Sequence, residues 1–315
     1  MRTRRLPKTD IDISVLGFGC WAIGKTYWGD DVDDNTSAEA VRAALDVGIN
    51  WFDTAPLYGE GHADEVLVQA LGPAKHEAII ATKVGVRFGG KGEHASSDLS
   101  PDWIREDTEA SLKRLGIDAI DLLQVHWPCE KETALEDSIA ALEDLRTEGK
   151  IRYFGLCNYG PDETSKASQH EGMVSLQTPY SLLRRELEGP LLAACSDIGV
   201  LVYEPLCRGL LTGKFRELPH FPETDMRAWD ERFQGSRFQH ARRLINDLER
   251  VGQKVGLPTS AIAIGWAVAQ PGITAAIAGA KTPLQVQQNA LASRVLDQPK
   301  VSMVVDKIAS IHGGE

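Results

Sequence analysis

Three short apolar runs in this chain each end in an ionisable residue. The residues that close these runs are Asp53, Lys83 and His126, and Tyr58 follows Asp53 after a proline-containing turn. The parallel strands of a barrel all end at one face, and the side chains at those ends form its active site. We therefore expect these four side chains to share one small space.

The remaining apolar runs extend this pattern along the whole chain. Strands are expected at residues 13–16, 49–52, 78–82, 120–125, 152–156, 173–176, 200–202 and 273–277. Helices are expected at residues 36–48, 63–71, 100–116, 133–149, 187–198, 240–255, 259–269, 283–292 and 301–311, and a short one begins at residue 161. Stretches rich in glycine, proline and polar residues at 85–97 and 213–237 are expected to be loops. Strands that alternate with helices and lack a linker predict an α/β fold, a (β/α)8 TIM barrel that forms a single domain over residues 1–315.

Two of the expected helices begin with the pattern of a capping box. Thr36 is followed by Glu39 at this spacing, and Thr133 is followed by Glu136. In a capping box the hydroxyl accepts from a backbone N–H of the first turn, and the carboxylate reaches back to the cap. We therefore expect Thr36 and Thr133 to be N-cap residues.

Composition limits the partners and the setting of the protein. The chain has 34 Lys and Arg against 45 Asp and Glu, a formal net charge of −11, which argues against a nucleic-acid partner. No apolar run is long enough to span a bilayer, so no membrane partner is expected. The five cysteines form no CxxC pair, which is typical of a reduced, cytoplasmic protein. The oligomeric state is left open.

Two other barrel or nucleotide-binding classes are disfavoured by the sequence context. Residues 17–22 match a GxGxxA dinucleotide fingerprint, but the helix that must open at its end is missing. A metal-dependent barrel hydrolase needs several ligands that converge at strand ends, and His126 is the one histidine at an expected strand end. We expect no metal.

The four clustered residues are suited to the reduction of a carbonyl group. Tyr58 can supply a proton to the oxygen, and a neighbouring Lys83 ammonium is expected to lower the pKa of that phenol. Asp53, paired with Lys83, would keep the lysine charged and oriented. His126 can donate a hydrogen bond to the substrate oxygen and fix its approach.

Nearly the whole chain resembles the aldo-keto reductase family, in its bacterial branch. Residues 48–55 with Tyr58 and Gly59 are similar to the first signature of the family, and residues 122–126 and 149–152 match later segments. The resemblance implies that Asp53, Tyr58, Lys83 and His126 are the catalytic tetrad and that the cofactor is a nicotinamide dinucleotide. The activity it implies is NAD(P)(H)-dependent interconversion of aldehydes, ketones or sugar-type carbonyls with alcohols by hydride transfer.

The resemblance also assigns cofactor contacts residue by residue. Cys157, Asn158 and Gln177 correspond to the residues that hold the carboxamide, and Tyr203 corresponds to the tyrosine that stacks on the nicotinamide. Residues 206–214 are similar to the pyrophosphate loop, and residues 279–289 to the adenosine-phosphate site. The full set of expected cofactor residues is Trp21, Asp53, Cys157, Asn158, Gln177, Tyr203, Pro205, Leu206, Arg208, Gly209, Leu211, Gly213, Lys214, Gly279, Lys281, Thr282, Gln285, Gln288 and Asn289.

Three positions depart from the pattern of the family. Cys157 replaces a serine, so a weaker thiol faces the carboxamide. Gln285 stands where NADP-preferring members often carry an arginine, and Gln288 stands where a glutamate often binds adenine. Lys281 can still pair with a 2′-phosphate, and we therefore expect NADP(H) to be favoured over NAD(H).

Aromatic residues are expected to line the mouth of the site and to meet a small carbonyl or alcohol substrate. The expected substrate contacts are Trp21, Trp28, Tyr58, Phe88, His126 and Trp127, with Trp229 as a further candidate. Such a mouth suits aromatic aldehydes and also sugars that stack on indole rings. A second hypothesis stays open, in which the barrel is a nucleotide-binding, redox-sensing subunit of a larger assembly with slow or no turnover.

Overall fold

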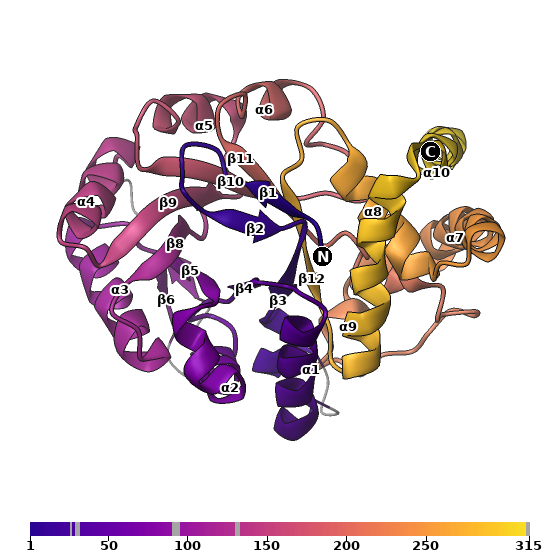
Figure 1. Ribbon diagram of the computed structural model, residues 1–315, viewed down its shortest axis with the longest axis horizontal. Coiled ribbons are helices and arrows are strands. Elements are labelled where there is room, and N and C mark those ends of the chain that lie inside the picture. The colour runs from indigo at the N-terminus through magenta and orange to yellow at the C-terminus, as the bar shows by residue number, and fades with distance from the viewer. Residues whose placement is uncertain (26, 29–31, 90–94, 130–132, 313–315) are drawn as a thin grey trace.

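A closed barrel of parallel strands forms the centre of the computed structural model, which describes residues 1–312 except 26, 29–31, 90–94 and 130–132 (Figure 1). Around the barrel the strands follow the order β10-β11-β12-β3-β4-β5-β8-β9. In chain order they are β3 (Leu16–Gly19), β4 (Trp51–Asp53), β5 (Ile79–Val84), β8 (Ile120–Val125), β9 (Ile151–Cys157), β10 (Met173–Pro179), β11 (Gly199–Tyr203) and β12 (Ala275–Gly279). The predicted (β/α)8 TIM barrel is confirmed.

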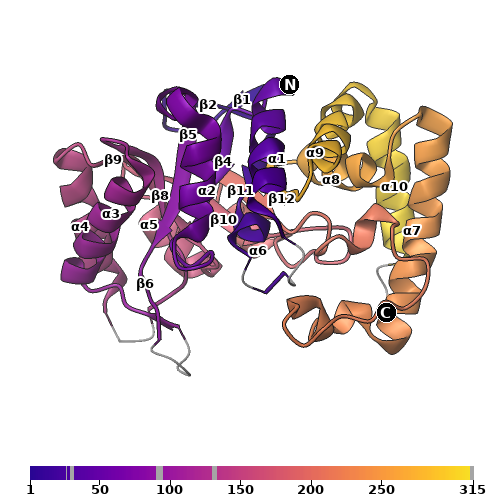
Figure 2. The same ribbon diagram turned by 90° about the horizontal axis from the view of Figure 1, so that it is seen from below.

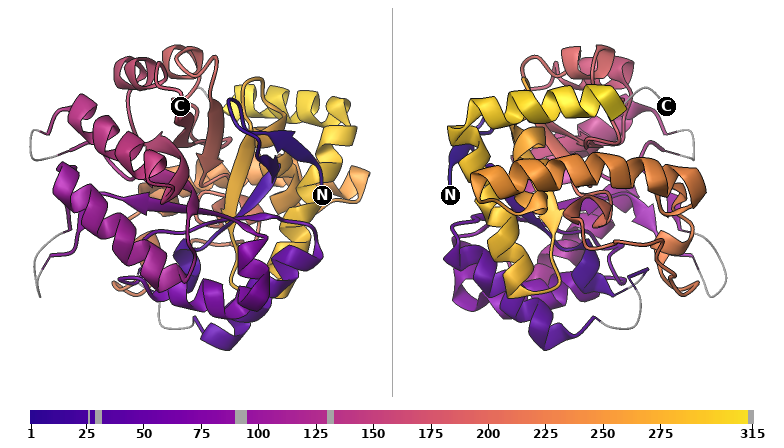
Figure 3. Two further views of the ribbon diagram at one scale, coloured as in Figure 1. Left: turned by 60° about the vertical axis from the view of Figure 1, so that its left-hand side comes forward. Right: turned by 90° about the vertical axis from the view of Figure 1, so that its right-hand side faces the viewer.

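Helices surround the barrel, and three of them gather on one side. The helices are α1 (Asp34–Asp46), α2 (His62–Leu71), α3 (Pro101–Leu115), α4 (Leu135–Thr147), α5 (Pro161–Ala167), α6 (Pro190–Ala193), α7 (Gly235–Val255), α8 (Thr259–Ala269), α9 (Pro283–Ala290) and α10 (Pro299–His312). In Figure 3 the long helix α7 runs beside α10 on the flank that also carries α8. None of the described helices combines the length and the hydropathy needed to cross a bilayer.

The first expected strand is displaced, because the chain begins with a hairpin. The expected strand at residues 13–16 is divided between β2 (Asp12–Ser14), which pairs antiparallel with β1 (Thr3–Arg5), and the start of β3. Leu6, Ile11 and Ile13 of this hairpin region are buried in one apolar cluster with barrel residues such as Trp51. The hairpin therefore covers the end of the barrel where the strands begin (Figure 1).

The loops that follow the strands lie at the opposite end of the molecule. Figure 2 shows β1 and β2 at one end, and β6 together with the segment before α7 at the other. The expected loop at 85–97 contains a short ribbon of β6 (Val86–Arg87) and β7 (Ser96–Ser97), and its residues 90–94 lie outside the described part. The expected loop at 213–237 contains the 3₁₀ helices η4 (Met226–Ala228) and η5 (Glu231–Phe233), and α7 begins inside it.

Both predictions of a capping box are wrong. Helix α1 begins at Asp34, and its N-cap is Asp33, whose Oδ2 accepts from the Thr36 backbone nitrogen at 2.7 Å and from its hydroxyl at 2.8 Å. Helix α4 begins at Leu135 with Ala134 at the N-cap and no side-chain cap. In α1 the Asp33 carboxylate, one turn earlier, competes for the same N–H groups. The local spacing of Thr36 and Glu39 does not reveal this competition.

Other helix boundaries also changed. The helix expected at 187–198 is reduced to α6, where Gly189 adopts a φ of 95° before Pro190. The helix expected at 283–292 ends at residue 290, and the 3₁₀ helix η6 (Leu291–Asp297) continues from it. The last expected strand, at 273–277, lies two residues later as β12. Turn geometry at these points depends on neighbouring segments rather than on local periodicity.

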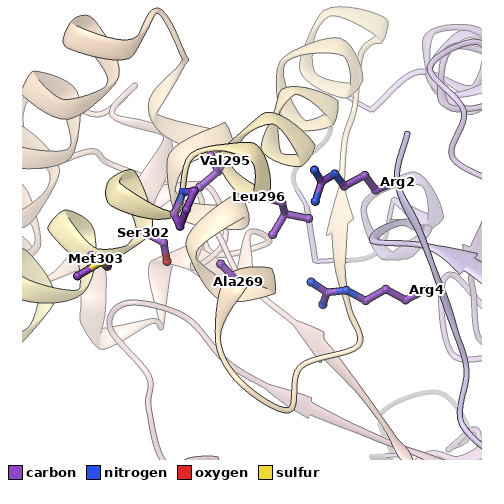
Figure 4. Close-up of a pocket in the computed structure, with 8 residues that line it drawn as sticks. Arg2, Arg4, Ala269, Val295, Leu296, Ser302 and Met303 are labelled. Carbon is purple, nitrogen blue, oxygen red and sulfur yellow. The ribbon is translucent and has the colours of Figure 1, made fainter.

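A hollow of about 340 Å³ lies where the N-terminal hairpin meets the C-terminal helices (Figure 4). Its lining residues are Arg2, Arg4, Ala269, Val295, Leu296, Pro299, Ser302 and Met303. Arg4 Nη1 donates to the carbonyl oxygens of Ile273 at 2.6 Å and Val268 at 3.0 Å, and Arg2 pairs with Asp297. Arg4 therefore ties β1 to the end of α8 and the turn after it, and Arg2, just before β1, ties the chain to η6.

We predict that Arg4→Ala lowers the free energy of unfolding by about 1.5–3 kcal/mol, because charge-assisted bonds to backbone carbonyls are lost. Urea denaturation measures this change. Arg5→Ala is the matched control on the same strand, since Arg5 is paired with Asp12 at the surface. Equal denaturation midpoints for the two variants would show that the Arg4 contacts do not hold the hairpin.

Candidate active site

Lys83 lies at the centre of the predicted constellation and contacts two of its other members. Its Nζ donates to Asp53 Oδ1 at 2.6 Å, to the Thr54 carbonyl oxygen at 3.0 Å and to Tyr58 Oη at 3.1 Å. Asp53 and Lys83 are almost fully buried, with 2% and 1% of their surface exposed. The three hydrogens of one ammonium group are thus directed at three oxygen atoms.

Strand register and one tight turn bring these side chains together. Asp53 is the last residue of β4 and pairs with Ala81 of β5, so that Lys83 lies two residues further along the adjacent strand. Tyr58 returns to this point through Gly59, which has a φ of 68°. A Cβ at Gly59 would lie 2.2 Å from the Gly24 carbonyl oxygen. The glycine therefore lets the tyrosine loop pack against the segment after β3.

The second carboxylate oxygen of Asp53 is held by two buried glutamines. Gln177 Nε2 donates to Asp53 Oδ2 at 2.7 Å, and Gln124 Nε2 donates to it at 3.4 Å. Gln177 was predicted to contact the cofactor, and its amide nitrogen also ties it to Asp53. Gln124 was not predicted at all. Its signal in the sequence is its place two residues before His126, because alternate residues of a strand share a face.

Burial and charge set the protonation of Lys83 and Tyr58. Burial alone would lower the pKa of Lys83, but the Asp53 carboxylate and the Tyr58 oxygen outweigh it and raise that pKa. Burial raises the pKa of the Tyr58 phenol, and the Lys83 ammonium opposes this rise. The Lys83 ammonium lowers the pKa of Tyr58, as predicted, but burial has the larger effect and leaves this pKa above its ordinary value. Desolvation of the phenolate outweighs the attraction of the ammonium, so Tyr58 carries its proton at neutral pH.

His126 faces Tyr58 as a neutral imidazole. Its ring centroid is 6.1 Å from that of Tyr58, at an interplanar angle of 82°, and it stacks on Trp127 at 4.3 Å. Burial, and then the nearby Lys83 charge, lowers the pKa of His126 well below its ordinary value. One ring nitrogen of the neutral form is a hydrogen-bond donor.

Asn158 joins His126 to the predicted nicotinamide-binding residues. Asn158 adopts a φ of 66°, its Nδ2 donates to the His126 carbonyl oxygen at 3.1 Å, and its Oδ1 accepts from Tyr203 Oη at 2.7 Å. The Cys157 thiol lies 3.6 Å from Gln177 Oε1. Burial raises the pKa of Cys157 to about 12, so the thiol keeps its proton. These residues therefore form one connected group beside the tetrad.

Arg208, expected at the pyrophosphate, lies in a network of ion pairs. Its Nε donates to Glu204 Oε1 at 2.9 Å, and its Nη1 donates to Asp230 Oδ2 at 3.1 Å. Arg232 pairs with the same two carboxylates. The guanidinium carbon of Arg208 also lies 5.8 Å from the Trp21 ring. These acidic partners were not predicted, and they come from the end of β11 and from the long loop before α7.

Lys281 connects two segments that are far apart in the sequence. Its Nζ donates to the Trp28 carbonyl oxygen at 2.9 Å, and its backbone nitrogen donates to Gln285 Oε1 at 2.8 Å. Thr282 is the N-cap of α9, and its hydroxyl accepts from the Gln285 backbone nitrogen at 3.3 Å. Gln285 therefore supports the start of α9 with both its backbone nitrogen and its side chain.

The other expected cofactor residues lie along the same rim. Gly279 ends β12 opposite Gly19 at the end of β3. The residues of the loop after β11 are Pro205, Leu206, Gly209, Leu211, Gly213 and Lys214, with the 3₁₀ helix η3 (Leu210–Thr212) among them. Asn289 is buried on α9, and Gln288 is exposed there.

Most of the expected substrate residues meet at an aromatic mouth. Trp21 stacks on Tyr58 at 6.2 Å and meets Trp28 edge to face at 5.4 Å. Phe88 is 42% exposed beyond β6 and has no ring contact within the described residues. Trp229 is 59% exposed and contacts Tyr27. The structure therefore groups Trp21, Trp28 and Trp127 with the tetrad and leaves Phe88 and Trp229 further out.

No cluster of three or more His, Cys, Asp or Glu side chains in the described part of the chain is arranged to hold a metal ion.

Comparisons with known proteins agree with the barrel. The sequence model of the "Aldo/keto reductase family" matches residues 15–309. "Aldo-keto reductase YhdN" of Bacillus subtilis is 36% identical over 91% of this chain and 87% of its own length. "NADH-specific methylglyoxal reductase" of Escherichia coli is 33% identical over 94% of each chain. The solved structure of the glycerol dehydrogenase AKR11B4 from Gluconobacter oxydans is 34% identical, with a TM-score of 0.87 over 98% of this chain and 95% of that one.

We predict that His126→Asn removes part of the acid sensitivity of the fold. The pKa of His126 lies below 6.5 in the folded protein. At a pH between the folded and unfolded pKa values, the unfolded chain therefore binds a proton that the folded chain does not bind. The free energy of unfolding therefore decreases as the pH falls below 6.5, by about 1.4 kcal/mol per pH unit from this residue. Denaturant titrations between about pH 5 and 7 measure this slope. His76→Asn, at an exposed site, is the control, and an unchanged slope in His126→Asn would refute the burial effect.

Proposed function

The chain belongs to the aldo/keto reductase family, and we propose that it is an NAD(P)(H)-dependent oxidoreductase that interconverts small aldehydes or ketones and alcohols. The observation that carries this proposal is the Lys83 ammonium, which lies within hydrogen-bond distance of both Asp53 and Tyr58 at the strand ends of the barrel. A protonated phenol can act as a general acid, and a buried cation next to it stabilises the phenolate that forms.

The rim beside the tetrad fits a nicotinamide dinucleotide. β3 and β12 end in Gly19 and Gly279, so the backbone carries no side chain at this point of the rim. Arg208 and Lys214 would hold the pyrophosphate, and the capped start of α9 would meet the adenosine end. The Tyr203 ring, fixed through its hydroxyl to Asn158, would stack on the nicotinamide. The bound reduced coenzyme supplies a hydride.

Tyr58 is the proposed proton donor for reduction and the proton acceptor for oxidation. Its proton is present at neutral pH, since a phenol ordinarily titrates near pH 10 and burial raises this pKa further. The Lys83 ammonium stabilises the phenolate that forms when this proton leaves, and Asp53 keeps the ammonium charged and in place. His126 donates a hydrogen bond to the substrate oxygen and orients it toward Tyr58.

The aromatic mouth bounds the substrate class. Trp21, Trp28 and Trp127 give an aromatic, largely apolar wall beside the proposed proton donor. Relatives are named for methylglyoxal and glycerol, which are small and oxygen-rich. We therefore propose small aldehydes, ketones or sugar-type carbonyls and the matching alcohols as substrates.

We propose NADP(H) as the favoured coenzyme, on the strength of Lys281. Lys281 directly precedes the Thr282 cap of α9, and its ammonium, which donates to the Trp28 carbonyl oxygen, would add a charge-assisted bond to a 2′-phosphate bound there. NAD(H) is the alternative coenzyme, because the relative from Escherichia coli is named NADH-specific.

The rival hypothesis is a nucleotide-binding, redox-sensing subunit of a larger assembly. Both hypotheses need the same cofactor rim, but only an enzyme needs the protonated Tyr58 and its aromatic substrate wall. An absorbance screen of carbonyls and alcohols with both coenzymes separates them: tight coenzyme binding without turnover would favour the sensing subunit.

We predict that Tyr58→Phe lowers kcat by about 10²–10⁴ while the Kd of the coenzyme stays nearly unchanged, because only the proton donor is lost. Stopped-flow absorbance and fluorescence titration measure the two quantities. Tyr153→Phe is the matched control, since the Tyr153 hydroxyl donates to Asp10, far from the tetrad. A Tyr58→Phe variant with near wild-type kcat, and with hydride transfer still limiting, would refute the assignment.

We predict that Lys281→Ala weakens the binding of NADP(H) by about tenfold to a hundredfold and the binding of NAD(H) much less, because one charge-assisted bond to the 2′-phosphate is lost. Fluorescence titration gives the Kd of each reduced coenzyme. Lys214→Ala is the control, because the pyrophosphate is common to both coenzymes and both should weaken alike. Equal weakening of the binding of both coenzymes in Lys281→Ala would instead show that the lysine acts through its hydrogen bond to the Trp28 carbonyl oxygen and not through the 2′-phosphate.

A further inference from the structure

A buried polar chain lies behind the tetrad, on the helix side of the barrel. The Thr54 hydroxyl donates to Asp64 Oδ1 at 2.6 Å, and Arg114 Nε donates to Asp64 Oδ2 at 2.7 Å. Asp64 belongs to α2 and Arg114 to α3, and neither Asp64 nor Thr54 has any exposed surface. The residue that follows Asp53 is therefore fixed by an ion pair between two helices.

This chain reaches the reacting groups through the backbone of Thr54. Its carbonyl oxygen accepts from Lys83 Nζ at 3.0 Å, and its backbone nitrogen donates to the Ala81 carbonyl oxygen at 2.9 Å. The carbonyl takes one of the three hydrogens of the ammonium, and the other two point to Asp53 and Tyr58. The orientation of this one peptide group thus limits where the ammonium can point.

The backbone nearby is shaped to let the ion pair form. Gly61 precedes α2 with a φ of 92°, and a Cβ at this position would lie 2.6 Å from Arg114 Cδ. A larger residue would push Arg114 away from Asp64. Asp107 of α3 accepts from the Gly85 backbone nitrogen at 2.9 Å and so holds the end of β5 from the same layer. The strand ends that carry Asp53 and Lys83 are both anchored to these helices.

We propose that Thr54, held by Asp64 and Arg114, is a positioning residue that keeps the Lys83 ammonium against Tyr58. The role rests on the proposed function, since it acts on the proposed proton donor. Thr54 touches neither substrate nor coenzyme in this role. Its hydroxyl fixes the peptide, the peptide carbonyl fixes the ammonium, and the ammonium stabilises the phenolate. Buried hydrogen bonds to a carboxylate are strong enough to hold such a geometry.

Two substitutions at Thr54 isolate the hydroxyl. Thr54→Val has nearly the same shape and lacks the hydroxyl, whereas Thr54→Ser keeps the hydroxyl and loses a methyl group. Displacement of a catalytic group by about an ångström can cost ~10² in rate, so we expect Thr54→Val to lower kcat about tenfold to a hundredfold. Thr54→Ser is expected to keep most of the activity. The Kd of the coenzyme and the KM are expected to stay near wild type in both.

A second readout does not need turnover. With 13C-labelled tyrosine, NMR shows the Cζ resonance of Tyr58, which is assigned by its loss in Tyr58→Phe. This resonance reports the hydrogen bond between the phenol oxygen and Lys83. We expect it to move in Thr54→Val and to stay in place in Thr54→Ser. In the Tyr58→Phe background, Thr54→Val is expected to cause no further loss of kcat, because its effect passes through the phenol.

The outcomes separate this proposal from the proposed function. A wild-type protein without turnover would refute the enzyme, and the Tyr58 resonance would still decide the role of Thr54. A Thr54→Val variant that is less stable, yet keeps its kcat and the Tyr58 resonance of the wild type, would show that the polar chain only supports the fold. Where Thr54→Val does not fold, Asp64→Asn is measured instead. It is expected to move the same resonance, and an unmoved resonance there would overturn the proposal.

Discussion

Burying the charge of Lys83 is the constraint on which the site depends. Removing an ammonium group from water costs several kcal/mol unless opposite charge and oxygen acceptors replace the solvent. Here Asp53, the Thr54 carbonyl and Tyr58 supply these acceptors from the end of β4 and the turn that follows it. Two glutamines then hold the other oxygen of Asp53. The polar interior at this end of the barrel is therefore arranged in layers around one cation.

The same low-dielectric surroundings fix the forms of the other two groups. Desolvation disfavours charge on either, so Tyr58 stays a phenol and His126 stays a neutral imidazole. A protonated donor and a neutral hydrogen-bonding ring are the forms that carbonyl reduction requires. The Lys83 ammonium contributes most when Tyr58 loses its proton, because it then attracts the negative charge that develops on the phenol oxygen.

The two ends of the barrel have different roles: one end stabilises the fold, and the other carries the candidate active site. At one end the N-terminal hairpin inserts Leu6, Ile11 and Ile13 into the apolar interior, and arginines tie it to the C-terminal helices. At the other end, glycine-ended strands, ion-paired Arg208 and the capped start of α9 form a polar rim. Loops at that rim can differ between relatives while the strands that position the tetrad stay in register.

The barrel and the meeting of Asp53, Tyr58, Lys83 and His126 followed from the sequence, because apolar runs and their terminal residues are local features. Other features needed the folded chain. Asp33 displaces Thr36 as the cap, the hairpin takes residues 13 and 14 from the first expected strand, and Glu204 and Asp230 engage Arg208. Burial also raises the pKa of Tyr58 by more than Lys83 lowers it, and this could not be predicted, since spacing reveals a neighbouring charge but not the depth of burial. Periodicity and strand ends are written in the sequence, whereas desolvation and long-range pairing exist only once distant segments have packed together.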